Sequence, residues 1–341
     1  MINSLTYLTR RCPRKCGYCA IRDAKNVGPE LSPEQWIKAF KILKELGVQF
    51  NLILGNETWL LGEDLLTILK SNTVPFALYT TCPEPTFSHY RDKFFESGVL
   101  DNLSCGMDYP IIEGLYVEDD SYHKSKSAFE AFKWIKKNYP DVDTQGNITV
   151  HRKNLKAVPL LVDQLSQMGV FIGMNFIHWN SDGKFDFFPG REGIEDLLFK
   201  KEDFPKIVNI LNRILKSPGL LQNPEILQMI VNKPELLLMG WHCQGDPYGG
   251  PSIDADGTLR VCGYRTGRRT NKLSIFDLPK HWHEWRDAVY LDAMECPGCN
   301  WAYPMMVRFW EETDNIMGRE VFVKHAGRHI DENKWSKRII E

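Results

Sequence analysis

The chain has 341 residues, of which 43% are hydrophobic and 25% are charged, and its formal net charge is −2. This length and composition allow one large core with a smaller satellite domain, and the near-neutral charge gives no general attraction to nucleic acid. No apolar run approaches the roughly 20 residues of a membrane span. The nine cysteines are not preceded by a basic and then apolar leader, so they predict a reducing, cytoplasmic location.

Three cysteines follow an apolar segment near the N-terminus. Cys12, Cys16 and Cys19 have the spacing C-x3-C-x2-C, and Tyr18 precedes the last of them. Thiolates bind zinc and iron–sulfur clusters, and a purely structural site of either kind normally has four protein ligands. A site with three thiols leaves one position open, which favours chemistry on a bound cofactor or substrate.

This motif resembles that of the radical S-adenosylmethionine (SAM) superfamily. The resemblance implies that the three thiols hold a [4Fe-4S] cluster, that SAM chelates the fourth iron, and that Tyr18 lies near the adenine. Reduction would split SAM into methionine and a 5′-deoxyadenosyl radical, which abstracts a hydrogen atom from the substrate while the protein excludes water. Reduced flavodoxin or ferredoxin would be the electron donor. The alternative is a zinc site that Cys82 or His151 completes.

The next predicted elements are a buried strand over Val48–Leu54 and a helix from Gly62 to Lys70. Between them lies the sequence GNET at residues 55–58. It resembles the Gly-Gly-Glu-Pro segment with which the family binds the amino group of SAM, although its second and fourth residues differ. By this resemblance Gly55 and Glu57 bind SAM. A helix-capping or solvated carboxylate is the alternative for Glu57.

Further short apolar segments predict strands that alternate with helices. They are Phe76–Thr80, Leu103–Met107, Ile148–Val150 and Val170–Ile177. This alternation predicts parallel βαβ units with the motifs at the ends of the strands. The chain is therefore expected to be α/β. About six units fit the partial (β/α)6 TIM-like barrel that the resemblance implies better than a closed barrel of about 250 residues.

Polar residues follow the later strands. Ser104 and Asp108 stand at the fourth strand, Arg152 and Asn154 follow the fifth, and His178 follows the sixth. The resemblance implies that the first four contact the ribose and carboxylate of SAM and that His178 contacts its adenosyl group. Ordinary hydrogen bonds within loops are the alternative.

A second group of cysteines lies downstream, at Cys243, Cys262, Cys296 and Cys299. The sequence Asp254–Gly257 predicts the turn of a hairpin whose returning strand is Leu259–Val261. This arrangement resembles the twitch or SPASM extension, which holds an auxiliary [4Fe-4S] cluster. No cysteine follows Cys299, so the single-cluster twitch form fits better. A structural zinc ion is the alternative.

Basic residues follow the hairpin. Arg265, Arg268 and Arg269 suit phosphate or carboxylate groups, so they are candidate contacts to a nucleotide, a nucleic acid or an acidic peptide. A solvated loop is the alternative. The two remaining cysteines, Cys82 and Cys105, are assigned to structure, because free cysteine is usually a small buried residue. For Cys82, which opens the loop after the third strand, a place in the lining of the substrate pocket is the alternative.

Four regions follow from these patterns. They are a barrel at 1–190, a helical connection at 191–239, a twitch-like domain at 240–305 and a helical tail at 306–341. The sequence thus predicts a radical SAM enzyme with two [4Fe-4S] clusters that abstracts hydrogen from a polar substrate, giving oxidation, isomerisation or bond formation. The substrate would be a nucleotide or modified nucleobase, a sugar, or a peptide side chain. The alternatives are a peptide- or protein-modifying maturase and a non-enzymatic zinc protein that binds nucleic acid.

Overall fold

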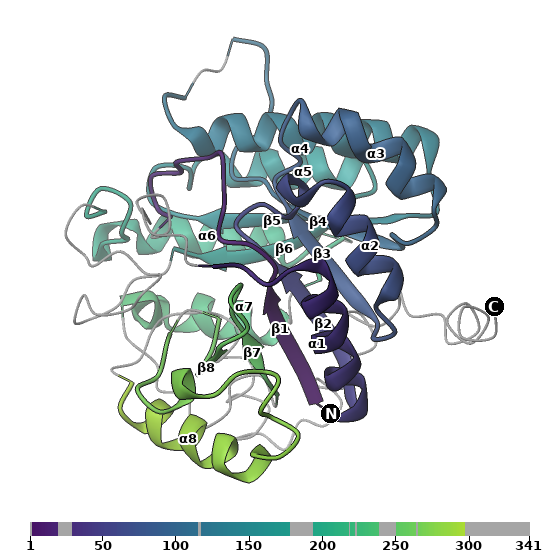
Figure 1. Cartoon of the computed structure of the whole chain (residues 1–341). Helices are drawn as coiled ribbons and strands as arrows, with labels where there is room; N and C mark the ends of the chain where they lie inside the picture. The colour runs from purple at the N-terminus through teal and green to yellow at the C-terminus, as the bar shows by residue number, and fades with distance from the viewer. Residues whose placement is uncertain are drawn as a thin grey trace.

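The computed structural model describes residues 2–19, 29–114, 117–177, 194–217, 219–221, 224–238, 250–263 and 265–296. In this part of the chain, alternating strands and helices come first, and a short hairpin and a long helix follow (Figure 1). The boundaries predicted after residues 190, 239 and 305 fall at or within residues outside these ranges, so the division into four regions stays a prediction.

The strands are β1 Ile2–Tyr7, β2 Val48–Leu54, β3 Phe76–Thr80, β4 Asn102–Gly106, β5 Asp143–Val150, β6 Phe171–Phe176, β7 Ser252–Ile253 and β8 Leu259–Arg260. They form one sheet in the order β6-β5-β4-β3-β2-β1-β7-β8. Strands β1 to β6 pair in parallel with their neighbours in sequence. This arrangement confirms the predicted α/β class and the partial barrel of six units. The hairpin extends the sheet, since β7 pairs in parallel with β1 and β8 returns antiparallel to β7.

The α-helices are α1 Pro33–Glu45, α2 Glu63–Ser71, α3 Thr86–Glu96, α4 Asp120–Asn138, α5 Val158–Gln167, α6 Phe204–Ile214, α7 Pro224–Asn232 and α8 Trp282–Met294. Short 3-10 helices are η2 Thr58–Leu61, η3 Lys201–Asp203, η4 Pro234–Leu238 and η5 Thr270–Lys272. Helices α1 to α5 connect successive strands and cover one face of the sheet (Figure 1). Both α7 and η4 start at a proline, because the first helical position needs no backbone N–H donor.

The two faces of the sheet differ in character. Successive side chains of a strand point to opposite faces. The outer face carries buried apolar residues that pack with the helices, among them Ile53, Leu78, Leu103, Ile148 and Ile172. The inner face carries half-buried residues, among them Leu52, Tyr79, Gln145, Asn147 and Asn175. The apolar core therefore lies between the sheet and its helices, and the inner face remains available to line a site.

Strand β5 is longer than the sequence suggests. The apolar segment predicts a strand at Ile148–Val150, whereas β5 begins at Asp143. Its burial alternates residue by residue along the whole strand. The first residues include Gln145 and Asn147, whose side chains lie on the inner face. The sequence of this part of β5 therefore contains no apolar run that would predict a strand.

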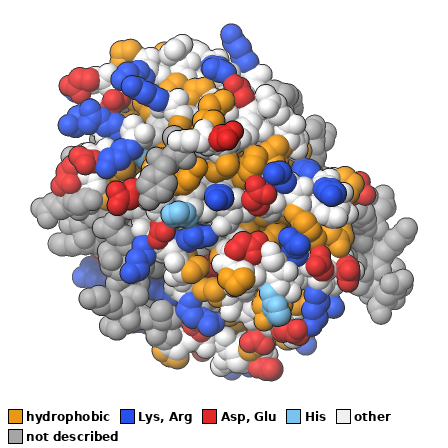
Figure 2. Space-filling view, turned by 90° about the horizontal axis from the view of Figure 1, so that it is seen from above, with side chains coloured by type: hydrophobic (Ala, Val, Ile, Leu, Met, Phe, Trp, Pro, Cys, Tyr) orange, Lys and Arg blue, Asp and Glu red, His pale blue; other side chains and the backbone are white. Residues whose placement is uncertain are grey.

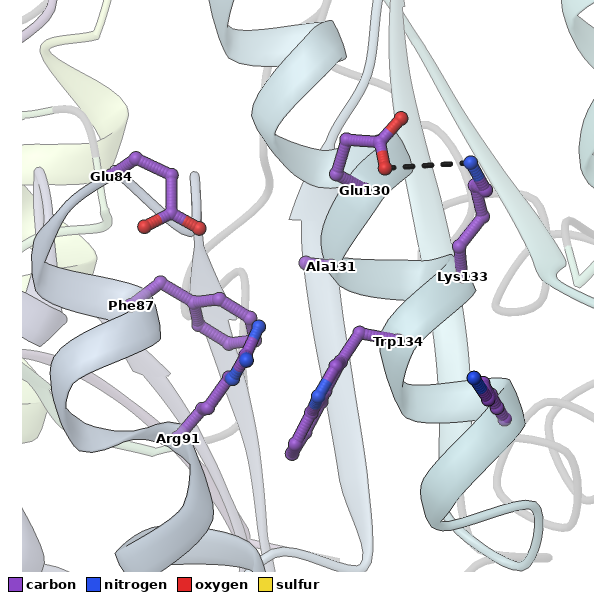
Figure 3. A pocket seen from close by; sticks show the side chains of 8 residues that line it. Glu84, Phe87, Arg91, Glu130, Ala131, Lys133 and Trp134 are labelled. Atoms are coloured by element: carbon purple, nitrogen blue, oxygen red, sulfur yellow. Dashed lines mark hydrogen bonds and ion pairs between the residues drawn. The ribbon is translucent and has the colours of Figure 1, made fainter.

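A pocket of about 320 Å³ lies in the helical layer between α3 and α4 (Figure 3). It is lined by Glu84, Phe87, Arg91, Glu130, Ala131, Lys133, Trp134 and Lys137. The guanidinium of Arg91 faces the indole of Trp134, with Cζ 4.4 Å from the ring centroid. None of the candidate site residues lines this pocket, so the site lies elsewhere.

The surface seen in Figure 2 has no large field of one charge. Basic and acidic side chains are interspersed there with hydrophobic ones. None of the described helices is both long and apolar enough to cross a membrane.

Candidate active site

The three N-terminal cysteines lie in one loop (residues 8–19, the cysteine loop) directly after β1. This is the carboxyl edge of the parallel strands, where barrels of this class place their active sites. Cys12 is exposed, Cys16 is buried and Cys19 is half-buried. Burial raises the pKa of Cys12 to about 11 and that of Cys16 to about 12. These thiols therefore keep their protons until a metal displaces them.

The first half of the cysteine loop is held by two neighbouring segments. The backbone N–H of Asn56 donates to the carbonyl of Thr9 at 3.1 Å, and its side chain donates to the carbonyl of Arg10. A Cβ atom at Gly55 would lie 3.2 Å from Cγ2 of Thr9, so glycine allows this close approach. Glu30 accepts hydrogen bonds from the hydroxyl of Thr9 at 2.7 Å and the N–H of Arg10 at 2.9 Å. The segment that the sequence links to SAM thus also fixes the cysteine loop.

The second half of the loop is held by the N-terminus of α4. Asp119 caps this helix, and its Oδ2 accepts from the N–H of Gly17 at 3.3 Å. Asp120 accepts from the N–H of Lys15 at 2.6 Å. A Cβ atom at Gly17 would lie only 2.7 Å from Oδ2 of Asp119. The position of Cys16 between these two N–H groups is therefore set by α4.

Tyr18 is anchored by an ion pair that the sequence does not reveal. Its hydroxyl donates to Oδ2 of Asp108 at 2.5 Å, and Nζ of Lys124 contacts both groups. Asp108 also accepts from the N–H of Thr149 at 2.8 Å. Burial tends to lower the pKa of Lys124, but the charge and hydrogen bond of Asp108, together with Cys16 and Cys19, raise it above its usual value. Lys124 thus stays charged beside the cysteine loop.

Glu57 is fully buried and caps η2. One oxygen accepts from the N–H of Trp59 at 3.1 Å and the hydroxyl of Thr80 at 2.6 Å. The other accepts from the N–H of Thr81 at 2.7 Å and from its hydroxyl. Burial raises the pKa of Glu57 despite these hydrogen bonds. The carboxylate ties the ends of β2 and β3 together, and its contact with SAM stays a prediction.

Asn154 has a structural role in the loop after β5. Its amide nitrogen donates to the carbonyls of Asp108 at 3.0 Å and Thr149 at 2.9 Å, and its oxygen accepts from the N–H of His151 at 2.8 Å. The side chain is fully buried. Asn154 therefore holds Asp108 in place, while a direct contact to SAM stays a prediction.

The other predicted SAM contacts are less closely grouped. Ser104 lies on the inner face and accepts a hydrogen bond from the amide of Asn147. Arg152 forms an ion pair with Asp203 at the start of α6, at 3.1 Å. His178 lies outside the described residues. Ser104 thus lies on the inner face of the sheet, whereas the side chain of Arg152 pairs with Asp203 just before α6.

Two members of the second cysteine group are described. Cys262 is half-buried and follows β8, while Cys296 is buried and follows α8. Arg265 donates to the carbonyl of Glu295 at 3.3 Å, which joins the residues next to these two cysteines. Cys243 and Cys299 lie outside the described residues.

The predicted substrate arginines are engaged by α8. Arg269 pairs with Asp292 and with Glu295, both at 2.8 Å, and Arg268 pairs with Glu295 at 2.7 Å. These two guanidinium groups hold the pKa of Glu295 at about 2. Asp292 is almost fully buried and also accepts from the N–H groups of Arg269 and Thr270. The arginines therefore fix α8 against the loop after β8, and their contact with a substrate stays a prediction.

The donor set of the cysteine loop fits an iron–sulfur cluster. No three His, Cys, Asp or Glu side chains of the described ranges are arranged to hold a metal ion. Metal sites often form only as the metal binds, and three thiols on one loop beside the charge of Lys124 suit an anionic cluster. Cys82 and Cys105 are buried in the apolar core with their sulfur atoms 3.3 Å apart. Their placement agrees with the structural assignment.

Comparison with known proteins finds a family model that matches the N-terminal part of the chain. Residues 6–165, a little under half of the chain, match the family model of the Radical SAM superfamily. SuiB of Streptococcus suis bound to S-adenosylmethionine is similar in structure, with a TM-score of 0.57 and 14% identity over 85% of this chain. The chain spans only 66% of SuiB. The anSMEcpe protein with bound AdoMet has a TM-score of 0.57 and 16% identity, over 97% of this chain and 99% of that one. At these identities the likeness shows a shared fold.

Proposed function

Because residues 6–165 match the family model of the Radical SAM superfamily, we propose that the protein cleaves SAM reductively and abstracts a hydrogen atom from a peptide side chain. The ligands of the SAM-binding [4Fe-4S] cluster are Cys12, Cys16 and Cys19. With SAM bound, such a cluster supplies the electron that splits SAM into methionine and a 5′-deoxyadenosyl radical.

The observation that carries this proposal is the fixation of the cysteine loop at the carboxyl edge of the sheet. Asn56 and Glu30 hold its first half, and Asp119 and Asp120 hold its second half. A reactive radical requires ligands and substrate held in fixed positions. The loop is thus organised from neighbouring segments before any cofactor binds.

Other residues of the site would orient SAM. Gly55 and Glu57 would receive its amino group, and Ser104 would contact its ribose. Tyr18 would lie beside the adenine, held by Asp108 and Lys124. Polar contacts of this kind would fix the direction of bond cleavage relative to the inner face.

A second [4Fe-4S] cluster would be held by Cys243, Cys262, Cys296 and Cys299. The support is the network by which the loop after Cys262 is joined to the end of α8 just before Cys296. Four thiolate ligands leave no open iron, so this cluster would transfer electrons or stabilise the domain and would not bind substrate directly. Reduced flavodoxin or ferredoxin would supply the first electron.

The inner face favours a peptide over a nucleotide. None of the strands β1 to β6 contains a lysine or an arginine. Apart from Asp143 at the start of β5, the polar residues of these strands are neutral, with Gln145, Asn147 and Asn175 among them. Amide side chains both donate and accept hydrogen bonds, as peptide groups do, whereas phosphates require cations. The structure of SuiB bound to precursor peptide SuiA, with a TM-score of 0.56, has a similar fold.

The cleavage activity is tested by anaerobic reconstitution with iron and sulfide, followed by a dithionite assay for 5′-deoxyadenosine. Wild-type protein is expected to form it, and Cys16→Ala is expected to give only the background amount. Cys105→Ala is the matched control, because this buried cysteine lies in the core. Equal formation by Cys16→Ala would disprove the ligand assignment.

The substrate class is tested by isotope transfer. Pools of peptides with deuterated side chains and of deuterated nucleotides are incubated separately with the reconstituted enzyme and SAM. Deuterium in 5′-deoxyadenosine from the peptide pool is the expected result. Transfer from the nucleotide pool alone would replace the peptide proposal with a nucleotide one.

A further inference from the structure

Asp254, at the start of the hairpin turn, joins the two cysteine-bearing segments. Arg10, two residues before Cys12, donates from Nε to Oδ1 of Asp254 at 2.7 Å and also contacts Oδ2 through Nη2. Arg260, two residues before Cys262, pairs with Oδ2 through Nη1 at 2.7 Å. Segments that are far apart in the sequence thus converge on one carboxylate.

The surroundings of Asp254 make this junction rigid. Asp254 is 2% exposed and Arg260 is fully buried. Oδ1 of Asp254 also accepts from the N–H of Ala255 at 2.7 Å, which fixes the carboxylate to the turn. Removal of one partner from such a buried group leaves an uncompensated charge. Arg10 and Arg260 are therefore constrained to move together.

A second contact links the same segments. The hydroxyl of Tyr7, the last residue of β1, donates to the carbonyl of Gly263 at 2.7 Å. Gly263 directly follows Cys262, and Tyr7 directly precedes the cysteine loop. Tyr7 thus lies close to both segments.

We propose that Asp254 is a positioning residue that couples the two metal sites, so that cluster binding at Cys262 changes SAM affinity at the cysteine loop. The proposal rests on the two-cluster function proposed above. Ligation of Cys262 would fix β8 and Arg260. Through Asp254 and Arg10 it would then fix the backbone just before Cys12. Coupling between sites is reciprocal, so SAM binding would in turn stabilise the auxiliary site.

The first test compares Asp254→Asn with Asp256→Asn. Asp256 is in the same turn but exposed, and its Oδ1 accepts from the N–H and hydroxyl of the neighbouring Thr258. In reconstituted protein we expect Asp254→Asn to weaken SAM binding by about fivefold or more, in the range of typical coupling. We also expect it to alter the electron paramagnetic resonance spectrum of the SAM-bound cluster. Asp256→Asn is expected to change neither.

A double-mutant cycle separates coupling from local damage. Cys262→Ala and Asp254→Asn are each expected to weaken SAM binding. The double variant is expected to bind SAM with about the same affinity as the single variant that binds it less tightly. If the two losses multiply, or if folded Asp254→Asn binds SAM as the wild type does, the proposal is overturned. Arg10→Gln, at a partly exposed position, is the second variant should Asp254→Asn fail to fold.

Hydrogen exchange on the metal-free protein keeps this test separate from the proposed function. We expect Asp254→Asn to speed exchange both at residues 8–12 and at 258–263, and Asp256→Asn to leave residues 8–12 unchanged. Faster exchange at only one segment contradicts the coupling. If wild-type protein binds no second cluster, the two-cluster function fails, and the exchange result still decides whether Asp254 couples the segments.

Discussion

Nζ of Lys124 lies 2.5 Å from Oδ2 of Asp108, and neither side chain is more than 7% exposed. The hydroxyl of Tyr18 contacts both the carboxylate of Asp108 and the ammonium group of Lys124. An ion pair so deeply buried is maintained only when both charges and their hydrogen bonds are present. The helix α4 thus supplies both the cap that holds the cysteine loop and the charge beside it.

Substitution Lys124→Met is therefore expected to leave Asp108 charged and buried without its partner. We expect a loss of about 3–5 kcal/mol in the free energy of unfolding. Urea denaturation of the metal-free protein measures this loss. Lys126→Met is the control, since Lys126 is exposed on the same helix and should change stability by less than about 0.5 kcal/mol. Equal stability of the two variants would show that the buried pair does not stabilise the fold.

Gly17→Ala is expected to lower the iron content after reconstitution. The new Cβ atom would lie 2.7 Å from Oδ2 of Asp119, so the Asp119 carboxylate or the cysteine loop would have to move and the contact between them would weaken. Gly114→Ala is the control for the loss of a glycine, because no described atom lies within 4 Å of the added Cβ, although the φ of +80° strains the backbone there. It should lose stability of about 1 kcal/mol without losing iron. Full iron loading of Gly17→Ala contradicts the proposed role of α4.

The stability of the protein is expected to depend on Glu295 in acid. Hydrogen bonds from Arg269 and Arg268 lower the pKa of this carboxyl from 4.5 to about 2. Its contribution is therefore complete above about pH 4.5 and is lost as the pH falls toward 2. Glu295→Gln should remove this part of the dependence, so the melting temperatures of variant and wild type should converge as the pH falls through this range. If the difference in melting temperature between the two proteins stays constant from pH 5 to pH 2, the role of these ion pairs is contradicted.

Much of the barrel could be predicted because its outer strand faces are apolar. Val48–Leu54 and Phe76–Thr80 have the predicted bounds, since each is a short apolar run with turn residues around it. The first half of β5 could not be predicted, because its side chains alternate between the core and the polar inner face. A strand that is buried on one face alone has no continuous hydrophobic run in its sequence.

The candidate site was predictable where residues are close in sequence. The cysteine spacing identifies the cysteine loop, and the hairpin turn at Asp254–Gly257 is confirmed by hydrogen bonds between residues 254, 257 and 258. Lys124 gives no comparable signal, because its burial depends on the distant Asp108 and Tyr18. In the same way, Arg268 and Arg269 look like free cations until α8 brings Asp292 and Glu295 beside them.

The most direct test of the central claim is the iron and sulfide content of anaerobically reconstituted wild-type and Cys262→Ala protein. Two four-iron clusters predict about eight irons and eight sulfides per wild-type chain and about four of each in the variant. Zinc in place of iron, or the same four irons in both proteins, would contradict the two-cluster site.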